Sequence, residues 1–320
     1  MHAIGIDIGG TKIAGALVDP QGEIVKQLRE PTPAGDSDAL KGIVIDMINE
    51  LADGTDAVAA GVAAPGFIDA TQSIVYYTPN VPWRHEPLRE AIEAKVSVPV
   101  IIENDANAAG WAEYRFGAGI QTTDMVMLTI GTGVGGAVVA GGKLFRGGYG
   151  AGAELGHMRV VPDGLPCGCG ASGCIEQYGS GRALQRYANT LADAGGIGQA
   201  LAAARVKSGG HLHGSDIGAL IEADDPGALQ ALRQLGDWLG QAAASFAAVL
   251  DPQLFVFGGG VAVAGEKLLA PIRQAFLQTL PARGYHPEPE FRIAQLVNDA
   301  GVVGAADVAR VRATDDKHAA

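Results

Sequence analysis

Long apolar runs and runs of basic residues are both missing from this chain. No apolar stretch approaches the ~18 residues of a membrane span: residues 242–250 end at Asp251-Pro252, and residues 254–263 contain three glycines. Acidic residues outnumber basic ones by 35 to 23, for a formal net charge of −12, and no Lys/Arg run occurs. We therefore expect neither nucleic acid nor membrane as a partner. The residues before Asp7 form no leader region, so we expect a cytoplasmic protein.

Cysteine is also scarce, and all of it lies in one short window. Cys167, Cys169 and Cys174 fall within eight residues, with glycines between them, and His157 lies ten residues upstream of Cys167. Three thiolates and one imidazole complete a tetrahedral zinc shell, and four protein ligands leave no open position, so the predicted zinc is structural. The alternatives are a disulfide with one thiol left over or a redox pair. The odd cysteine count and the Cys-x-Cys spacing weaken both.

Two glutamates flank this predicted zinc loop. Glu154 lies three residues before His157, and Glu176 lies two residues after Cys174. A metal that fixes His157 and Cys174 also fixes both carboxylates, which suits the binding of a hydroxylated molecule such as a sugar. The alternative is that both glutamates are ordinary solvated surface residues.

The chain repeats one arrangement of strands and glycine turns. Strands are expected at 3–8, 13–18 and 23–28, and again at 125–130, 137–140 and 143–145. Ile8-Gly9 aligns with Ile130-Gly131, so the two copies are 122 residues apart. Repetition of a whole supersecondary unit predicts an α/β fold of two domains with related topology and a cleft between them.

The remaining segments complete this plan. Further strands are expected at 57–63, 98–102, 254–257 and 291–296, and helices at 38–51, 106–114, 181–201, 217–250, 268–280 and 300–311. We expect a hinge near Gly117-Ala-Gly119. The predicted domains are a small one, residues 1–116 completed by 300–320, and a large one, residues 117–299, which carries the zinc loop.

Each copy of the repeat begins with a glycine turn that is suited to phosphate. Asp7-Ile-Gly-Gly-Thr-Lys12 combines glycines with a hydroxyl and an ammonium group, and residues 131–136 offer a second glycine turn. Glycines let phosphate approach backbone N–H groups closely, so the pair suggests a polyphosphate donor. Residues 131–136 also match G-x-G-x-x-G, but a dinucleotide site needs a helix after the glycines, and a strand is expected here. Ordinary hairpin turns are the alternative.

Asp105 is the candidate general base. It follows a predicted strand in the sequence Glu103-Asn104-Asp105, where functional groups of open α/β sheets commonly lie. A sugar hydroxyl that attacks phosphorus needs a carboxylate to accept its proton, and Asn104 beside it can bind neighbouring hydroxyls. The alternative is that Asp105 only caps the helix that starts at Ala106.

Together these motifs resemble the ROK family of sugar kinases, within the actin/hexokinase superfamily, over essentially the whole chain. The segments that carry the resemblance are residues 7–12, 64–66, 103–108, 131–136, 154–157 and 167–176, and residues 79–88 and 161–164 are similar to the ATP-dependent glucokinases of actinobacteria. The resemblance implies an actin/hexokinase-like duplicated fold. It also implies transfer of the ATP γ-phosphate to the 6-hydroxyl of glucose, which gives glucose 6-phosphate and ADP.

The resemblance also implies roles for individual residues. Asp105 would be the catalytic base, and the sugar ligands would be Gly66, Asn80, Asn104, Asp105, Glu154, His157 and Glu176. ATP would be bound by Asp7, Gly9, Gly10, Thr11, Lys12, Gly131, Thr132, Gly133, Gly258 and Gly259, with Asp7 assisting Mg²⁺. Zinc would be held by His157, Cys167, Cys169 and Cys174.

Several alternatives remain open within the resemblance. N-acetylglucosamine, N-acetylmannosamine and fructose kinases share the zinc loop and the Asn-Asp pair, and polyphosphate can replace ATP as donor. A sugar-sensing regulator without activity is the non-enzyme alternative. Repressors of the family carry a winged helix-turn-helix ahead of the phosphate turn, and only six residues precede Asp7, so we expect no repressor. We expect a homodimer or homotetramer, because closed assemblies are common among soluble enzymes.

Overall fold

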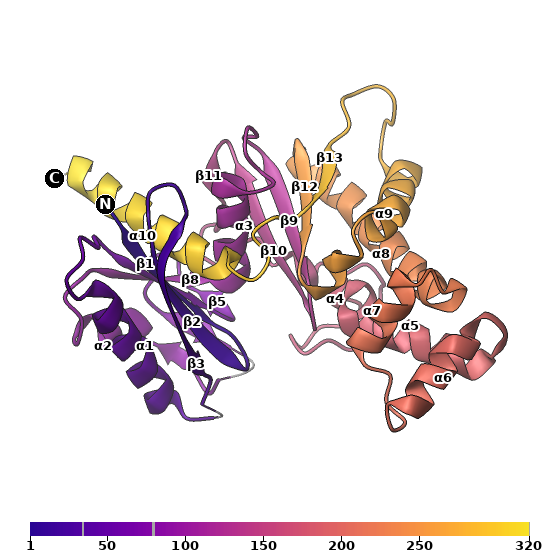
Figure 1. Cartoon of the computed structure of the whole chain (residues 1–320). Coiled ribbons are helices and arrows are strands. Elements are labelled where there is room, and N and C mark those ends of the chain that lie inside the picture. The colour runs from indigo at the N-terminus through magenta and orange to yellow at the C-terminus, as the bar shows by residue number, and fades with distance from the viewer. Residues whose placement is uncertain (34, 79–80, 320) are drawn as a thin grey trace. The chain divides into compact units, whose positions relative to one another are not determined.

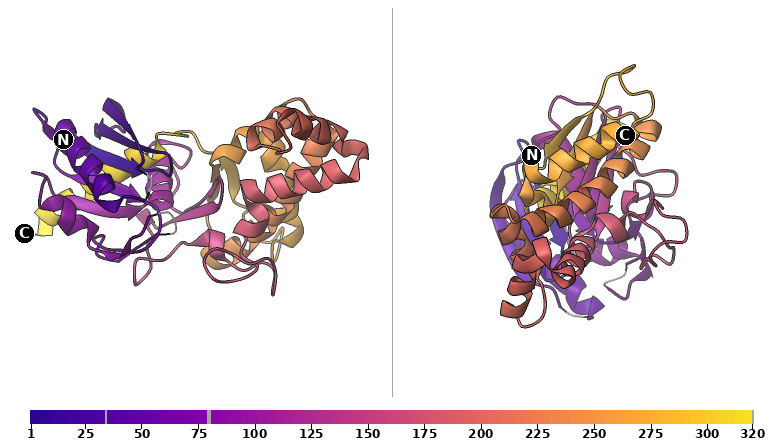
Figure 2. Two further views of the ribbon diagram at one scale, coloured as in Figure 1. Left: turned by 90° about the horizontal axis from the view of Figure 1, so that it is seen from below. Right: turned by 90° about the vertical axis from the view of Figure 1, so that its right-hand side faces the viewer.

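Two units make up the chain in the computed structural model, which describes residues 1–33, 35–78 and 81–319 (Figure 1). The first unit comprises Met1–Thr122, Ala137–Ala153 and Gln295–Ala320, and the second comprises Thr123–Gly136 and Glu154–Ala294. Relative to the sequence-based boundaries at 116/117 and 299/300, residues 117–122, 137–153 and 295–299 group with the first unit. The N-terminal strand and the C-terminal helix thus belong to one unit (Figure 2).

The first unit is built on a five-stranded sheet of order β3-β2-β1-β4-β8. Its strands are β1 (Ala3–Ile8), β2 (Lys12–Val18), β3 (Ile24–Pro31), β4 (Ala60–Ala64) and β8 (Val100–Asn104). The first three strands form an antiparallel meander, and β4 and β8 extend the sheet in parallel with β1. A small second sheet contains β5 (Phe67–Ile68), β6 (Val75–Tyr77) and β7 (Arg84–Glu86). These three short strands were not expected from the sequence, because strands of two or three residues are too short to show a period.

Helices pack on the first sheet in two different ways. They are α1 (Ser37–Ala52), α2 (Leu88–Glu93), α3 (Asp105–Phe116) and α10 (Ala300–Ala319). Helix α1 buries an aliphatic stripe, whereas α10 approaches the backbone itself. A Cβ on Gly5 or on Gly61 would lie within 2 Å of a carbonyl oxygen of α10, and a Cβ on Gly304 would lie equally close to the carbonyl of Ala108 in α3. Glycine at these three positions therefore allows α10 to lie directly on β1, β4 and α3.

A second five-stranded sheet repeats the topology of the five-stranded sheet in the first unit. The second five-stranded sheet has the order β11-β10-β9-β12-β13, with β9 (Met125–Ile130), β10 (Val134–Ala140), β11 (Lys143–Leu144), β12 (Leu254–Gly258) and β13 (Glu290–Ile293). Strands β9, β12 and β13 are parallel, as β1, β4 and β8 are, and the boundary between the units falls within β10. The predicted duplicated α/β fold is therefore confirmed.

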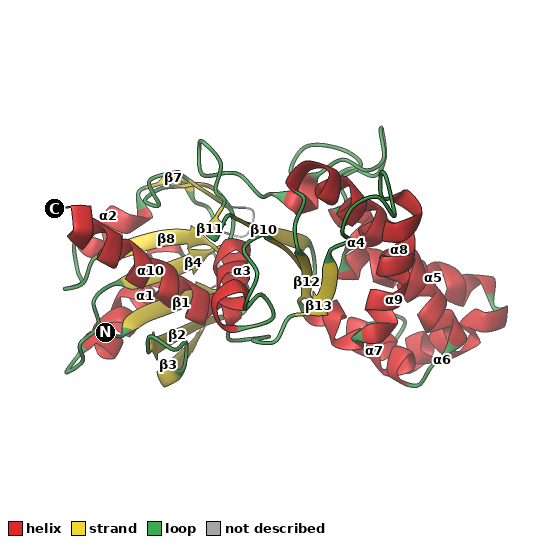
Figure 3. Cartoon of the chain, turned by 90° about the horizontal axis from the view of Figure 1, so that it is seen from above, coloured by secondary structure: helices red, strands yellow, loops and turns green. Residues whose placement is uncertain are grey.

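Helices make up most of the rest of the second unit (Figure 3). They are α4 (Glu176–Gly179), α5 (Gly181–Ala194), α6 (Gln199–Lys207), α7 (Gly214–Glu222), α8 (Pro226–Leu250) and α9 (Glu266–Thr279), with the 3-10 turns η1 (Leu155–His157), η2 (Gly196–Gly198) and η3 (Gly260–Ala264). No described helix in either unit is long and apolar enough to cross a membrane.

Two long helices expected from the sequence are each divided in two. The helix expected at 181–201 breaks where Gly195 and Gly196 both have positive φ. The helix expected at 217–250 breaks at Asp224, also at positive φ, and restarts at Pro226, with Asp225 as its N-cap. At both places the turn residues override the apolar period. Residues with left-handed backbone conformation end the first helix, and at the second break a proline at the first helical position begins the next one.

Candidate functional site

The carboxyl ends of the parallel strands collect the candidate residues of the first unit. Asp7 in β1 pairs with Ala63 in β4, and Ala64 pairs with Asn104 at the end of β8. Since these strands run in the same direction, the motifs that follow them meet at one edge of the sheet. Asn104 Nδ2 donates a hydrogen bond of 3.0 Å to the carbonyl of Gly66, so two of the predicted sugar ligands are in direct contact.

Asp105 is half-buried at the first position of α3. The N-cap of this helix is Asn104, whose Oδ1 accepts from the N–H of Asn107 at 3.0 Å. The alternative that Asp105 serves as the cap is therefore wrong. Asp105 accepts a hydrogen bond only 2.9 Å long from the N–H of Ala106, which lowers its pKa, but burial outweighs this and raises the pKa above its usual range. A carboxylate of raised pKa is a suitable proton acceptor near neutral pH.

Asp7 is a second acid with a raised pKa at this edge. Burial, and then the Asp105 carboxylate, raise the pKa of Asp7 to about 6, while the Lys12 ammonium opposes the shift. A Cβ on Gly301 would lie 2.5 Å from Asp7 Oδ2, so glycine is needed where α10 starts beside this carboxylate. Two carboxylates that disfavour each other's charge form an environment that a cation would stabilise.

The first glycine turn connects β1 to β2 as a tight hairpin. The N–H of Gly9 donates to the carbonyl of Lys12 at 3.0 Å, and a Cβ on Gly9 would lie 2.8 Å from that oxygen. Thr32 in the loop after β3 donates from its hydroxyl to the Gly9 carbonyl at 2.7 Å and thereby fixes the turn. Gly10, Thr11 and Lys12 are exposed. The turn therefore presents its backbone and both polar side chains to solvent.

Glu103 and Arg146 form part of this edge, although neither is among the site residues predicted from the sequence. Glu103 is 1% exposed, and its Oε2 accepts from Gln72 Nε2 at 3.0 Å and from Arg146 Nε and Nη2, each at 2.7 Å. Its Oε1 accepts from the N–H of Asn104 at 3.0 Å and from Asn107 Nδ2 at 3.1 Å. The sequence offers one indication of this ion pair: Glu103 lies at the end of an apolar strand, and a buried carboxylate needs a cation as its partner.

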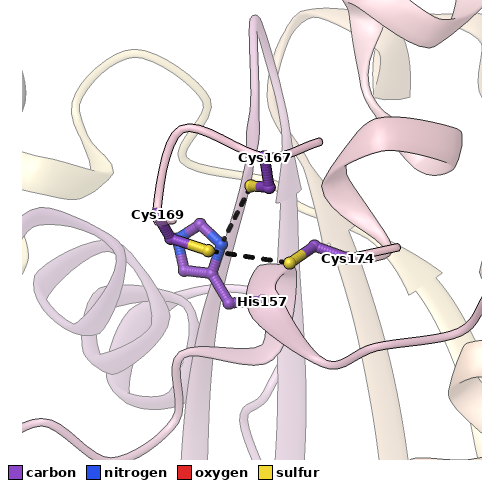
Figure 4. Close-up of side chains that lie close together, drawn as sticks. All are labelled: His157, Cys167, Cys169 and Cys174. Carbon is purple, nitrogen blue, oxygen red and sulfur yellow. Dashed lines mark hydrogen bonds between the residues drawn. The ribbon is translucent and has the colours of Figure 1, made fainter. Parts of the chain in front are cut away.

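The four predicted zinc ligands converge in the second unit (Figure 4). Their ligand atoms all lie within 4.8 Å of one another. Cys167 Sγ is 3.6 Å from His157 Nδ1, and Cys169 Sγ is 3.7 Å from Cys174 Sγ. The described cysteines form no disulfide.

These separations fit a tetrahedral zinc site. Zn–N and Zn–S bonds of ~2.1 and ~2.3 Å at the tetrahedral angle place ligand atoms ~3.6 Å apart for an N–S pair and ~3.8 Å apart for an S–S pair. Burial and the neighbouring thiols raise the pKa of Cys174 to about 12, so this residue is a thiolate only when a cation compensates its charge. Because Nδ1 faces the thiols, Nε2 is the ring nitrogen of His157 left to meet another ligand.

The two flanking glutamates occupy different positions around the cluster. Glu154 is half-buried and precedes η1, where its carbonyl accepts from the N–H of His157 at 3.0 Å. Glu176 is half-buried at the start of α4, with Oε1 3.6 Å from Cys167 Sγ and Oε2 3.2 Å from the N–H of Val134. Glu176 therefore contacts both the cysteine cluster and the second glycine turn, so the alternative of a merely solvated side chain is wrong for it.

A cavity of about 820 Å³ lies in the second unit beside the second glycine turn. It is lined by Gly131 and Thr132 of the turn, by residues 181, 182, 184 and 185 of α5, by residues 214, 215, 218, 221 and 222 of α7, by residues 260, 261, 263 and 264 of η3, and by Lys267. The expected nucleoside position, Gly258 and Gly259, ends β12 directly before η3. The sequence does not predict that α5 and α7 line this cavity, because helical glycines such as Gly214 and Gly218 form no recognisable motif.

One predicted ligand, Asn80, lies outside the described residues. Among the others, the structure brings together Gly66, Asn104, Asp105 and Asp7 in the first unit. In the second unit it brings together His157, the three cysteines, Glu176 and the turn that contains Gly131, Thr132 and Gly133.

The chain is similar to characterised sugar kinases over nearly its full length. It is 43% identical over 308 residues to a glucokinase of Streptomyces coelicolor, covering 96% of this chain and 97% of that protein. It is 35% identical to an N-acetylmannosamine kinase of Escherichia fergusonii, covering 97% and 99%. A crystal structure of a ROK family glucokinase from Streptomyces griseus, in complex with glucose and AMPPNP, is 43% identical, with a TM-score of 0.86 and coverage of 97% and 100%.

The duplicated sheets and their paired glycine turns define a hexokinase-like two-domain kinase fold. The ROK family model matches residues 3–312. The chain belongs to the ROK family, as its sequence motifs predict.

Proposed function

We propose that the protein is a glucokinase that transfers the γ-phosphate of ATP to the 6-hydroxyl of glucose. The observation that carries the proposal is Asp105, a half-buried carboxylate of raised pKa at the carboxyl edge of the first sheet, beside Asn104 and Asp7. The similarity to the Streptomyces glucokinases supports glucose as the acceptor and ATP as the donor.

In the proposed mechanism Asp105 accepts the proton of the 6-hydroxyl as its oxygen attacks the γ-phosphorus. Burial raises the pKa of Asp105, which strengthens it as a base, and the hydrogen bond from the N–H of Ala106 opposes this shift. Positioning supplies much of the remaining rate enhancement, because phosphoryl transfer requires in-line geometry more than covalent help from the protein.

The remaining predicted ligands divide between acceptor and donor. We propose that glucose hydroxyls are bound by Gly66, Asn80, Asn104, Glu154, His157 and Glu176. The phosphates of ATP would be bound by the turns at Gly9–Lys12 and Gly131–Gly133, and the nucleoside would occupy the 820 Å³ cavity beside Gly258 and Gly259. Asp7 fits a role toward Mg²⁺, since a bound cation would offset the burial and the repulsion by Asp105 that together raise its pKa. Such an ion would neutralise phosphate charge.

Zinc would fit His157, Cys167, Cys169 and Cys174, because the donor set and its 3.6 and 3.7 Å separations match a closed tetrahedral site. Its role would be to hold the loop from 157 to 176. His157 would then present Nε2 to the sugar while Nδ1 remains with the metal.

A kinase for another hexose is the second candidate, favoured by the N-acetylmannosamine kinase of Escherichia fergusonii. A coupled assay with glucose, mannose, fructose, N-acetylglucosamine and N-acetylmannosamine, each with ATP or polyphosphate, tests both. We expect the highest kcat/KM for glucose with ATP. A higher value for an N-acetylated sugar, or for polyphosphate, would refute the specific assignment, and no turnover with any pair would favour a sugar-sensing regulator.

We also propose a cytoplasmic homodimer or homotetramer. Light scattering of the purified protein tests the assembly, and a monomer at micromolar concentration would refute it.

A further inference from the structure

The carboxylate of Glu176 lies directly on the second glycine turn. Its Oε2 is 3.2 Å from the N–H of Val134, and a Cβ built on Gly133 would lie only 2.2 Å from the same oxygen. No side chain fits between Glu176 and the peptide that joins these two residues. The carboxylate therefore holds one end of the turn through a charge-assisted hydrogen bond.

The other end of the turn is held by the same segment of chain. The N–H of Gly181 donates to the carbonyl of Gly131 at 2.8 Å, and a Cβ on Gly181 would lie 2.7 Å from that oxygen. Gly181 begins α5, five residues after Glu176. Residues 176–181, which begin two residues after the last cysteine of the cluster, thus fix both ends of the turn 131–134.

This turn lies on the donor side of the proposed site. Gly131 and Thr132 line the 820 Å³ cavity, so the conformation of the turn determines where its backbone N–H groups point toward a bound polyphosphate. The second carboxylate oxygen of Glu176 is 3.6 Å from Cys167 Sγ. One side chain therefore connects the cysteine cluster with the phosphate-binding backbone.

We propose that Glu176 is a positioning residue for the donor phosphates, in addition to its proposed contact with the sugar, so that it sets nucleotide affinity even when no sugar is bound. The proposal rests on the proposed function, in which residues 131–133 bind phosphate. It follows from the geometry of the turn, because a loop held at both ends loses less conformational freedom when it binds an anion.

The test compares two substitutions of Glu176, one that keeps a hydrogen-bond acceptor for the N–H of Val134 and one that removes it. In Glu176→Gln the amide oxygen still accepts from Val134 N–H, and the amide NH₂ faces the Cys167 thiolate, so the turn remains fixed. In Glu176→Ala no acceptor remains. The affinity for Mg²⁺·AMPPNP, measured by calorimetry without sugar, should stay within about threefold of wild type for Gln and should fall about tenfold or more for Ala.

Three controls make the result specific. Zinc content and melting temperature are measured for each variant, so that metal loss or unfolding is not mistaken for a positioning effect. Glu176→Asp keeps the charge but shortens the side chain by one methylene, so it should weaken AMPPNP binding as Glu176→Ala does. It takes the place of Glu176→Ala if the alanine variant fails to fold. Glu50→Gln, a change at an exposed glutamate of α1 in the first unit, should bind AMPPNP like wild type.

The outcomes are distinct. Wild-type AMPPNP affinity in both Ala and Asp variants, with weakened glucose binding, would overturn the proposal and leave Glu176 as a sugar ligand alone. An equal loss in Gln and Ala, with wild-type affinity in Asp, would also overturn it, because charge rather than the hydrogen bond to Val134 would then be the cause. Wild-type protein that binds neither AMPPNP nor glucose would instead refute the proposed function on which the inference rests.

Discussion

Arg146 binds Glu103 through two N–H groups, with Nε and Nη2 both 2.7 Å from Oε2, and Glu103 is almost completely buried. The pair joins the end of β8, two residues before Asp105, to the loop that follows β11. Removal of one partner from such a pair leaves an unpaired charge in the interior. The ion pair therefore stabilises the backbone from which the proposed base projects.

We predict that Arg146→Met lowers the free energy of unfolding by roughly 3 kcal/mol. The physical reason is the unpaired Glu103 carboxylate, so the double variant Glu103→Gln/Arg146→Met should recover at least half of the loss. Urea unfolding followed by circular dichroism measures both values. A double variant no more stable than Arg146→Met would show that the unpaired carboxylate is not the cause of the loss.

Asp105→Asn should lower kcat by ~10² or more while leaving the melting temperature within a few degrees of wild type. The amide keeps the shape of the carboxylate but cannot accept a proton, and the cap of α3 is Asn104, which is unchanged. Steady-state kinetics with glucose and ATP measure the loss. A variant that retains a tenth of wild-type kcat would contradict the base role.

Asp7 should make stability depend on pH in a defined window. Its folded-state pKa of about 6 is above the unfolded value of 3.8, so the folded protein binds the proton more tightly. Stability is then lost as pH rises from about 4 to about 6, by up to ~3 kcal/mol for this one group. Asp7→Asn should consequently be more stable than wild type at pH 8.

Urea unfolding of Asp7→Asn and wild type from pH 4 to pH 8, without Mg²⁺ or nucleotide, tests this prediction. The difference in stability should be small at pH 4 and largest above pH 6. A constant difference across the series would show that Asp7 titrates normally. The groups that face Asp7 are the Asp105 carboxylate and the Lys12 ammonium, so Lys12→Met should enlarge the effect.

Removal of zinc should lower both thermal stability and sugar affinity. We expect one zinc ion per chain in freshly purified, untagged protein, and chelation should lower the melting temperature, because a closed site supplies folding energy. Elemental analysis and calorimetry with glucose measure the two effects. Cys174→Ser removes a buried ligand and should reproduce both losses. Elemental analysis that finds no zinc in the purified wild-type protein would contradict the assignment.

The sequence predicts the strands and their duplication well, because glycine turns and parallel strands leave clear patterns, and β1 and β9 have the expected bounds. It predicts that His157 and the three cysteines come together, because all four fall within eighteen residues. It does not predict the Glu103–Arg146 pair, whose partners are 43 residues apart, or the contact of Glu176 with Val134, 42 residues apart. Such contacts depend on how the loops pack in three dimensions, and no local sequence pattern indicates this packing.

Gly133 and Gly131 provide a matched pair of substitutions in the same turn. A Cβ on Gly133 would lie 2.2 Å from Glu176 Oε2, so Gly133→Ala must displace that carboxylate, whereas a Cβ on Gly131 would meet no protein atom within 4 Å. If the turn binds phosphate and Glu176 also binds sugar, Gly133→Ala should weaken both AMPPNP and glucose, by about tenfold each. Gly131→Ala should weaken AMPPNP alone, because its methyl group obstructs the donor without moving Glu176. Calorimetry with each ligand separately distinguishes the two patterns, and unchanged glucose affinity in Gly133→Ala would show that Glu176 does not reach the sugar.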